Sequence, residues 1–357
     1  MSGASHNTPL VSVVVLAHNA ETSVRRAIES IHNQTYDHCE IVAVDDGSTD
    51  RTGALLAASA ERDVRMQVVR TAAHGTCSAL DLALDSCDGD YVLVFDQDSW
   101  AEPTFISELV GMAEENCLDL VVGGFSLGIH REGNSHGASV VVNGPRSVFI
   151  TQHDFRAAAW QLFDSGQLLP TSGKLFSREV IDACGTRPGP SSLDDHSFVT
   201  SFLRDAERVG VTGTARYHVE RLLQNAADAI AGEYDRLETE HEDLVQLYRH
   251  WGLEGDSASM EMLQRRYLER LVDCIEDVCV GRCGMSGAER RQLVATMIST
   301  DRAKLAASVA RPQSGTAKAL VSPIRSGNVS LTYAQAWIAS LMRKYVGSDT
   351  IAPDSFV

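Results

Sequence analysis

The feature that most constrains the fold is a regular alternation of short apolar runs and amphipathic segments. The run at 11–16, VSVVVL, is rich in β-branched residues, as a strand buried on both faces should be. The segment at 21–33 instead has its apolar residues at helical spacing. Further strand-like runs, with helix-like segments between them, follow at 40–44, 66–69, 91–95 and 119–127. This order predicts βαβ units and an α/β fold, a doubly wound, mostly parallel sheet flanked by helices.

The alternation ends near residue 128, and the chain is expected to divide into three parts. Residues 1–9 are expected to be a flexible N-terminus. Residues 10–221 are expected to form the α/β domain, which closes with short antiparallel strands. Residues 222–357 contain helical patterns only, so an all-helical C-terminal extension is predicted.

Some features of the helical region are interpreted as structural. Ser286 and Glu289 fit a capping box that opens a helix. The acidic run at 233–244, EYDRLETEHEDL, is interpreted as a solvated helix face. Three cysteines at helical spacing in an apolar stretch are interpreted as packing residues rather than metal ligands: Cys274, Cys279 and Cys283.

Composition limits the partners and the compartment. Lysine and arginine total 31 against 48 acidic residues, and the net charge of −17 disfavours nucleic acid and anionic lipid as partners. The sequence contains no apolar run long enough for a transmembrane segment, and its first ten residues lack the features of a secretory signal. Eight cysteines without a C-x-x-C pair fit a reducing cytoplasm. A cytoplasmic protein is therefore expected. Peripheral association with the inner face of the membrane is the alternative.

Acidic residues are concentrated where the predicted strands end. Asp45 and Asp46 follow the second strand, and Asp96 and Asp98 follow the fourth. Ligands of open parallel sheets bind outside the carboxyl ends of the strands. A D-x-D pair there suits a hard divalent cation that carries a diphosphate, and Asp46 could accept the imide N–H of a uracil. For an isolated D-x-D the alternative is a solvated turn in which Asp98 caps the next helix.

Taken together, four stretches of the chain resemble the nucleotide-sugar-dependent family 2 glycosyltransferases, which have the GT-A fold. The strongest is the N-terminal signature, from SVVVLAHNAE to VDDGSTDRT. The others are DGDYVLVFDQDSWAEP at 88–103, GKLFSREVI at 173–181 and LDDHSF at 193–198. The resemblance implies a GT-A nucleotide-sugar-binding catalytic domain over 10–221. The resemblance does not extend to residues 222–357. This region is expected to lie on the acceptor side or to mediate oligomerisation, for instance as a homodimer.

The resemblance also implies a role for each matching position. Asp195 lies where the family keeps its general base. Asp98 would bind the metal, Mg²⁺ or Mn²⁺, and His218 is a second metal candidate whose alternative is a packed strand residue. Donor binding is implied for a set of strand-end and loop residues, namely Leu16, Ala17, His18, Asn19, Glu21, Asp46, Asp81, Asp96, Gln97 and Lys174.

The implied reaction is an inverting sugar transfer from a nucleotide-diphosphate donor to an acceptor hydroxyl. A UDP-sugar is the favoured donor. The acceptor would be a saccharide or a lipid-linked molecule in surface polysaccharide or glycoconjugate synthesis. The cation would stabilise the departing diphosphate, and Asp195 would take the proton of the attacking hydroxyl.

Several positions depart from the family pattern. Leu16 and His18 replace a proline and a tyrosine, and Gly173 replaces an asparagine. Ser99 stands where a further aspartate is common, and Leu80 replaces an arginine that could pair with phosphate. These departures support an alternative, a catalytically decayed nucleotide-binding or interaction module of the same fold. A dinucleotide-dependent oxidoreductase is disfavoured because no G-x-G-x-x-G follows any predicted strand.

Overall fold

The computed structural model describes residues 8–131, 134–189, 196–223, 229–280 and 285–346. The chain forms two compact units. The first comprises Met1–His130 and Ser139–Arg221, and the second comprises Arg131–Ala138 and Leu222–Val357. Of the expected flexible N-terminus, only residues 8 and 9 lie within the described part of the chain.

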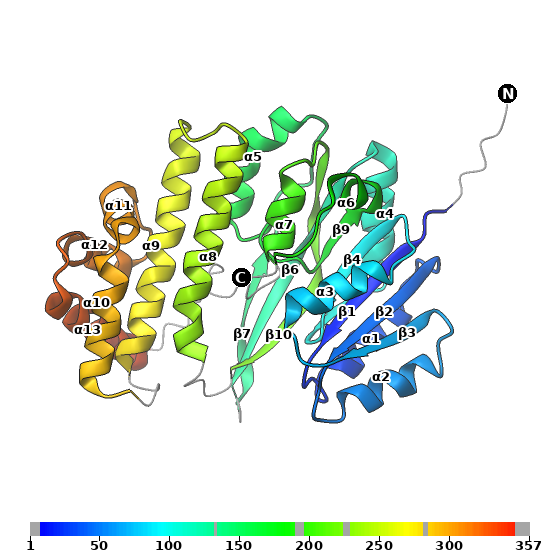
Figure 1. The fold of residues 1–357 in the computed structure, drawn as a ribbon, viewed down its shortest axis with the longest axis horizontal. Coiled ribbons are helices and arrows are strands. Elements are labelled where there is room, and N and C mark those ends of the chain that lie inside the picture. Colours follow the sequence, from blue (N-terminus) through cyan, green and yellow to red (C-terminus); the bar gives the residue numbers. More distant parts are fainter. Residues whose placement is uncertain (1–7, 132–133, 190–195, 224–228, 281–284, 347–357) are drawn as a thin grey trace. The chain divides into compact units, whose positions relative to one another are not determined.

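The strands form one ten-stranded mixed sheet (Figure 1). Their bounds are β1 Val11–Ala17, β2 Cys39–Asp46, β3 Met66–Thr71, β4 Tyr91–Asp96, β5 Ser99–Ala101, β6 Leu120–Arg131, β7 Asn134–Val142, β8 Ser147–Phe149, β9 Lys174–Ser177 and β10 Val209–Leu223. The order is β3-β2-β1-β4-β9-β6-β10-β5, with β7 paired to β6 and β8 to β10.

The first four strands are parallel, and they carry the predicted alternation. Their register places Leu16 of β1 beside Asp96 of β4, and Ala17 beside Asp45 of β2. The carboxyl ends of β1, β2 and β4 therefore meet at one edge of the sheet. From β9 onward the observed pairings with β4, β6, β8 and β5 are antiparallel, as expected for the short strands after residue 128. The predicted α/β sheet is confirmed.

Seven helices are described in the first unit: α1 Val24–His32, α2 Thr52–Ala60, α3 Thr76–Asp85, α4 Phe105–Asn116, α5 Gln152–Asp164, α6 Arg178–Cys184 and α7 His196–Leu203. Figure 1 shows α3 crossing one face of the parallel strands. The α1 helix buries the apolar positions that its spacing predicted, Val24, Ala27, Ile28 and Ile31. The β1 residues Val13–Val15 are fully buried, so the core lies between the sheet and its helices.

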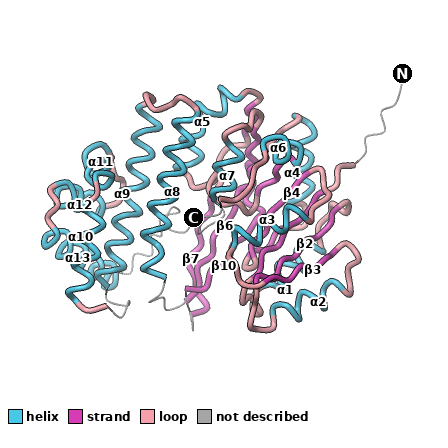
Figure 2. Tube along the Cα trace, viewed as in Figure 1, coloured by secondary structure: helices cyan, strands magenta, loops and turns pink. Residues whose placement is uncertain are grey.

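The second unit is helical from Ala229 onward, as predicted (Figure 2), and its described part also includes residues 134–138 of β7. Its described helices are α8 Ala229–His250, α9 Ser257–Val280, α10 Gly287–Ser299, α11 Asp301–Val309, α12 Gly315–Arg325 and α13 Val329–Val346. The capping box of Ser286 and Glu289 is present at the start of α10. Cys274 and Cys279 are buried in the core around α9, while Cys283 lies outside the described residues. Within the ranges that the structure describes, we find no helix of the length and apolarity that a membrane span requires.

The acidic run at 233–244 is not a solvated face, and this interpretation was wrong. Glu240 is buried and accepts from Arg266 and Arg270 of α9, with 3.3 Å between the Glu240 and Arg266 atoms. Glu238 binds Arg302 of α11 at 2.6 Å. Acids of this run form ion pairs with arginines of other helices, and the sequence of the run alone does not reveal these partners. The ion pairs compensate for the burial of the carboxylates.

Candidate active site

The loops that follow β1 and β2 are fastened to each other by polar contacts. The Asn19 N–H donates to Ser48 Oγ at 3.0 Å, and Asn19 Oδ1 accepts from the Thr49 N–H at 2.9 Å. The Ala20 N–H donates to Thr52 Oγ1 at 2.7 Å. Asn19 has a left-handed backbone with φ of 49°, a conformation that asparagine tolerates better than most residues. These hydrogen bonds therefore join the two loops beside the carboxyl edge of the sheet.

Glu21 extends this fastening. Its N–H donates to Asp50 Oδ2 at 3.1 Å, and its carboxylate accepts from the Arg51 N–H at 3.2 Å. Desolvation acts to raise the pKa of Asp50, but hydrogen bonds from Thr52 and from the Glu21 N–H outweigh it and lower this pKa. The side chain of Glu21, which was predicted to bind the donor, therefore already forms a hydrogen bond with the loop that follows β2.

The imidazole of His18 is exposed and oriented by its neighbours. Nδ1 lies 2.7 Å from the Asp46 carbonyl oxygen, which only accepts, so Nδ1 carries the proton. Nε2 lies 3.0 Å from the Asn19 side-chain nitrogen and accepts from it in the neutral ring. The His18 N–H donates to Gln97 Oε1 at 2.6 Å, which joins this loop to the D-x-D segment.

The carboxylates of the two acids at the end of β2 already interact with other groups of the chain. The Asp46 carboxylate is buried and accepts from the His74 and Gly75 N–H groups at 2.9 and 2.8 Å. Asp45 is fully buried; its Oδ1 accepts from the Ser48 N–H at 3.0 Å, and its Oδ2 forms an ion pair with Arg70 at 3.0 Å. Each Asp46 oxygen keeps a second acceptor position, so a contact with a base remains open to it.

At the end of β4, Asp96 is held at its backbone and at its carboxylate. Its Oδ2 accepts from the Ser172 hydroxyl at 2.7 Å, and its N–H donates to the Tyr217 hydroxyl at 3.0 Å. The Ser99 hydroxyl donates to the Asp96 carbonyl at 2.7 Å. Ser172 and Tyr217 were missed by the sequence analysis, because they lie 76 and 121 residues away along the chain.

Asp98 lies in the turn between β4 and β5 and is partly exposed. Its carbonyl accepts from the Glu220 N–H of β10 at 3.0 Å. The N-cap of the next helix, α4, is Thr104, so the alternative in which Asp98 caps that helix is wrong. Its backbone is held while the carboxylate stands at the turn, which suits a ligand for a cation.

His218 packs against β5. Its ring stacks on Trp100, with centroids 3.9 Å apart and an angle of 13° between the planes. Nδ1 lies 2.6 Å from Ser126 Oγ, and Nε2 lies 3.5 Å from Glu102. Within the described part of the chain, no three His, Cys, Asp or Glu side chains are grouped to hold a metal. A metal contact for His218 stays a prediction.

Two further predicted donor residues are engaged elsewhere. Lys174 of β9 is buried, and its ammonium donates to the Pro170 carbonyl. Asp81 of α3 faces Arg187 at 3.4 Å. Leu80, in place of the family's arginine, is fully buried, while Arg187 brings a cation to α3 that the sequence analysis did not single out.

The predicted general base, Asp195, and its neighbour Asp194 lie outside the described residues. The first described residue after them is His196, where α7 begins.

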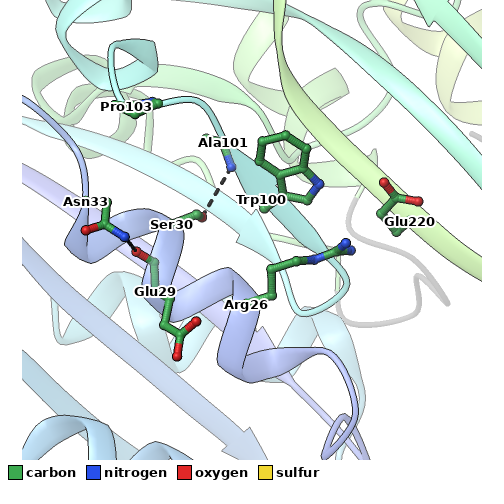
Figure 3. Close-up of a pocket in the computed structure, with 8 residues that line it drawn as sticks. All are labelled: Arg26, Glu29, Ser30, Asn33, Trp100, Ala101, Pro103 and Glu220. Carbon is green, nitrogen blue, oxygen red and sulfur yellow. Dashed lines mark hydrogen bonds between the residues drawn. The ribbon is translucent and has the colours of Figure 1, made fainter.

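A shallow groove of about 480 Å³ lies between α1, β5 and the end of β10 (Figure 3). Figure 3 shows Arg26 of α1 reaching toward Trp100 and Glu220 across it. Its lining is Arg26, Glu29, Ser30, Asn33, Trp100, Ala101, Pro103 and Glu220, which includes none of the predicted site residues.

Comparison with known proteins defines the class. Residues 12–184 match the family model described as Glycosyl transferase family 2. They form a family 2 glycosyltransferase domain, as the sequence motifs predicted.

Individual relatives agree with this class. The chain is similar to the uncharacterized glycosyltransferase EpsJ of Bacillus subtilis, at 26% identity over 262 residues, 69% of this chain and 72% of EpsJ. Among solved structures it resembles S. aureus TarS in complex with UDP-GlcNAc, with a TM-score of 0.63, 16% identity and coverage of 96% and 93%. It also resembles the mannosyltransferase PcManGT of Pyrobaculum calidifontis in complex with GDP-Man and Mn²⁺, with a TM-score of 0.53, 17% identity and coverage of 96% and 89%. The structural likeness confirms the GT-A fold.

Proposed function

We propose that this chain transfers a sugar from a UDP-sugar to a hydroxyl of a saccharide or lipid-linked acceptor in surface polysaccharide or glycoconjugate synthesis. One observation carries the proposal. Within a family 2 domain, His18, Asp46 and Asp96 meet at the carboxyl edge of three adjacent parallel strands. Ligands of open α/β sheets bind at this edge. The UDP-GlcNAc complex of the similar TarS supports a uridine donor.

In this proposal His18 lies against the nucleobase, with Leu16, Ala17 and Asn19 around it. The contact from Nδ1 to the Asp46 carbonyl fixes the plane of the ring, so the ring offers a preformed face. Asp46 would accept the imide N–H of uracil, and Asp96 would bind the ribose or the sugar.

A divalent cation, Mg²⁺ or Mn²⁺, fits the residues that follow β4. Such cations are commonly held by one or two carboxylates plus substrate phosphates, and Asp98 with Asp96 supplies hard oxygen ligands of this kind. The cation would stabilise the charge that develops on the leaving diphosphate. For His218 to join it, the imidazole would have to leave Ser126 and Trp100.

Asp195 is the proposed general base. A carboxylate that accepts the acceptor's hydroxyl proton raises its nucleophilicity, and direct in-line attack inverts the anomeric carbon without a covalent enzyme intermediate. The second candidate function is a decayed module that binds a nucleotide without transfer. Leu80 favours it, since a buried leucine supplies no cation to the diphosphate.

A thermal-shift panel of UDP, dTDP, GDP and CDP, each with and without Mn²⁺, tests the proposal. A nucleotide at about a hundred times its Kd adds about 2.7 kcal/mol, which shifts Tm by several degrees. We expect a metal-dependent shift with UDP that Asp98→Ala abolishes. Asp182→Ala, a surface acid paired with Arg178, is the matched control and should keep it. No shift with any nucleotide would refute donor binding, and a shift without sugar turnover would favour the decayed module.

A further inference from the structure

Three groups around Asp96 form a closed cycle of hydrogen bonds. The Asp96 N–H donates to the Tyr217 hydroxyl at 3.0 Å, and that hydroxyl donates to Ser99 Oγ at 2.5 Å. The Ser99 hydroxyl donates to the Asp96 carbonyl at 2.7 Å. Within this cycle each hydroxyl accepts one hydrogen bond and donates one, and both ends of the cycle are the backbone of Asp96.

The environment keeps this cycle intact. Tyr217 and Ser99 are fully buried or nearly so, where a hydrogen bond is electrostatically stronger than in water and linked bonds polarise one another. Burial raises the pKa of Tyr217 well above its usual range, and the charge of Asp96 adds to this. The hydroxyl therefore keeps the proton that it donates to Ser99.

The ring of Tyr217 is itself fixed by packing. It meets Phe95 edge-on at 5.1 Å and stacks on Phe105 at 5.6 Å between centroids. Gly173 approaches it closely, because a Cβ there would lie 3.1 Å from Tyr217 Cδ1, and φ at Gly173 is +70°. The departure from the family's asparagine at 173 thus makes room for this tyrosine.

The residue before that glycine holds the carboxylate of Asp96. The Ser172 hydroxyl donates to Asp96 Oδ2 at 2.7 Å, and the Gly173 N–H donates to the Val94 carbonyl of β4 at 3.0 Å. The segment that makes room for Tyr217 therefore also sets the direction of the acid. Ser99, the other departure in this part of the chain, provides the hydroxyl that completes the cycle.

We propose that Tyr217, acting with Ser99 through this cycle, is a positioning residue that holds Asp96 in its donor-binding orientation. The inference rests on the proposed function, since it gives Tyr217 a role only if Asp96 binds the donor. It explains why two positions that differ from the family pattern, 99 and 173, both contact one tyrosine.

Tyr217→Phe tests the inference, because it removes the hydroxyl and keeps the ring. We expect its Kd for UDP with Mn²⁺ to rise at least tenfold, as measured by calorimetric titration of the full chain. The exchange rate of the Asp96 backbone amide should also rise at least tenfold, since that amide loses its acceptor. Ser99→Ala opens the cycle at another point and should change both quantities in the same direction.

Tyr248→Phe is the matched control, because Tyr248 is a fully buried tyrosine of α8 in the other unit. A general loss of stability would affect both tyrosine variants, whereas the inferred role requires a change in nucleotide affinity in Tyr217→Phe alone. Wild-type binding of UDP with an unchanged Kd in Tyr217→Phe overturns the inference and leaves the proposed function standing. Absence of nucleotide binding by the wild-type chain overturns the proposed function, and this inference with it.

Discussion

At the carboxyl edge of β1, β2 and β4, Asp46 and Asp96 accept hydrogen bonds from backbone N–H groups and a hydroxyl, whereas between α8 and α9 the buried Glu240 pairs with buried arginines. Asp46 illustrates the first arrangement, since it accepts from two N–H groups of the loop before α3. Glu240 illustrates the second, since both of its arginine partners are as buried as it is. Carboxylates held by neutral donors keep their full negative charge available to a ligand. Carboxylates neutralised by arginine hold helices together and offer no charge to a ligand.

This difference predicts that changes at the edge of the sheet affect activity, and that changes between the helices affect stability. The largest effect on activity should follow Asp195→Asn, because the family resemblance proposes Asp195 as the general base. Asparagine cannot accept the acceptor's proton as a base, so sugar transfer, followed as UDP release, should fall by about 10²- to 10⁴-fold. The Kd for UDP and the Tm should stay at wild-type values.

Asp194→Asn is the control for that substitution, because it makes the same chemical change one residue away. It should reduce transfer far less than Asp195→Asn. A wild-type rate in Asp195→Asn would show that another group takes the proton.

Glu240→Ala should have the largest effect on stability. It leaves Arg266 and Arg270 buried without their shared carboxylate, and breaking a buried pair in this way costs about 3 to 5 kcal/mol. Urea unfolding should report this loss, while the Kd for UDP should not change. Glu254→Ala removes the exposed partner of Arg249 and should cost less than about 1 kcal/mol. Equal losses in the two variants would contradict the distinction between the two regions.

Acid should also act on the helical unit. Burial, with Arg302 nearby, lowers the pKa of His241 to about 4, while the unfolded chain keeps about 6.5. Glu238, Glu240 and Glu242 oppose this shift without cancelling it. The unfolded state therefore binds a proton between these pH values that the folded state does not. Stability from this group is complete above pH 6.5 and declines as the pH falls toward 4, by about 3 kcal/mol.

The measurement is the free energy of unfolding against pH for the wild type and for His241→Gln. The difference between the two curves isolates His241 from the other titrating groups. His250→Gln, at the exposed end of the same helix, serves as the control. A wild-type curve parallel to that of His241→Gln between pH 4 and 6.5 would rule out this contribution.

The same contrast shows what the sequence could predict. Period and β-branching are local signals, so they located β1 to β4 and therefore the acids that follow β2 and β4. The motifs added the family, and they proposed roles for individual residues that remain predictions. The cycle around Asp96 needs Ser172 and Tyr217, which reach it only through the pairing of late strands. The prediction that the acidic run of α8 is a solvated face failed for the same reason. The arginines that pair with the buried Glu240 come from another helix.

Gly173→Ala should have the smallest effect, and it tests whether the edge of the sheet is positioned by packing as well as by hydrogen bonds. An L residue at φ of +70° is strained by about 1 to 2 kcal/mol, and the new Cβ would also press on the ring of Tyr217. Gly185→Ala has nearly the same strain, with φ of +61°, but its Cβ would meet open space. Thermal unfolding should therefore show Gly173→Ala as the less stable of the two by about 1 kcal/mol. Only Gly173→Ala should also weaken the binding of UDP, because only it displaces the tyrosine that holds Asp96. Equal stability and equal nucleotide affinity in the two variants would mean that the close approach of Gly173 to Tyr217 has no bearing on the site.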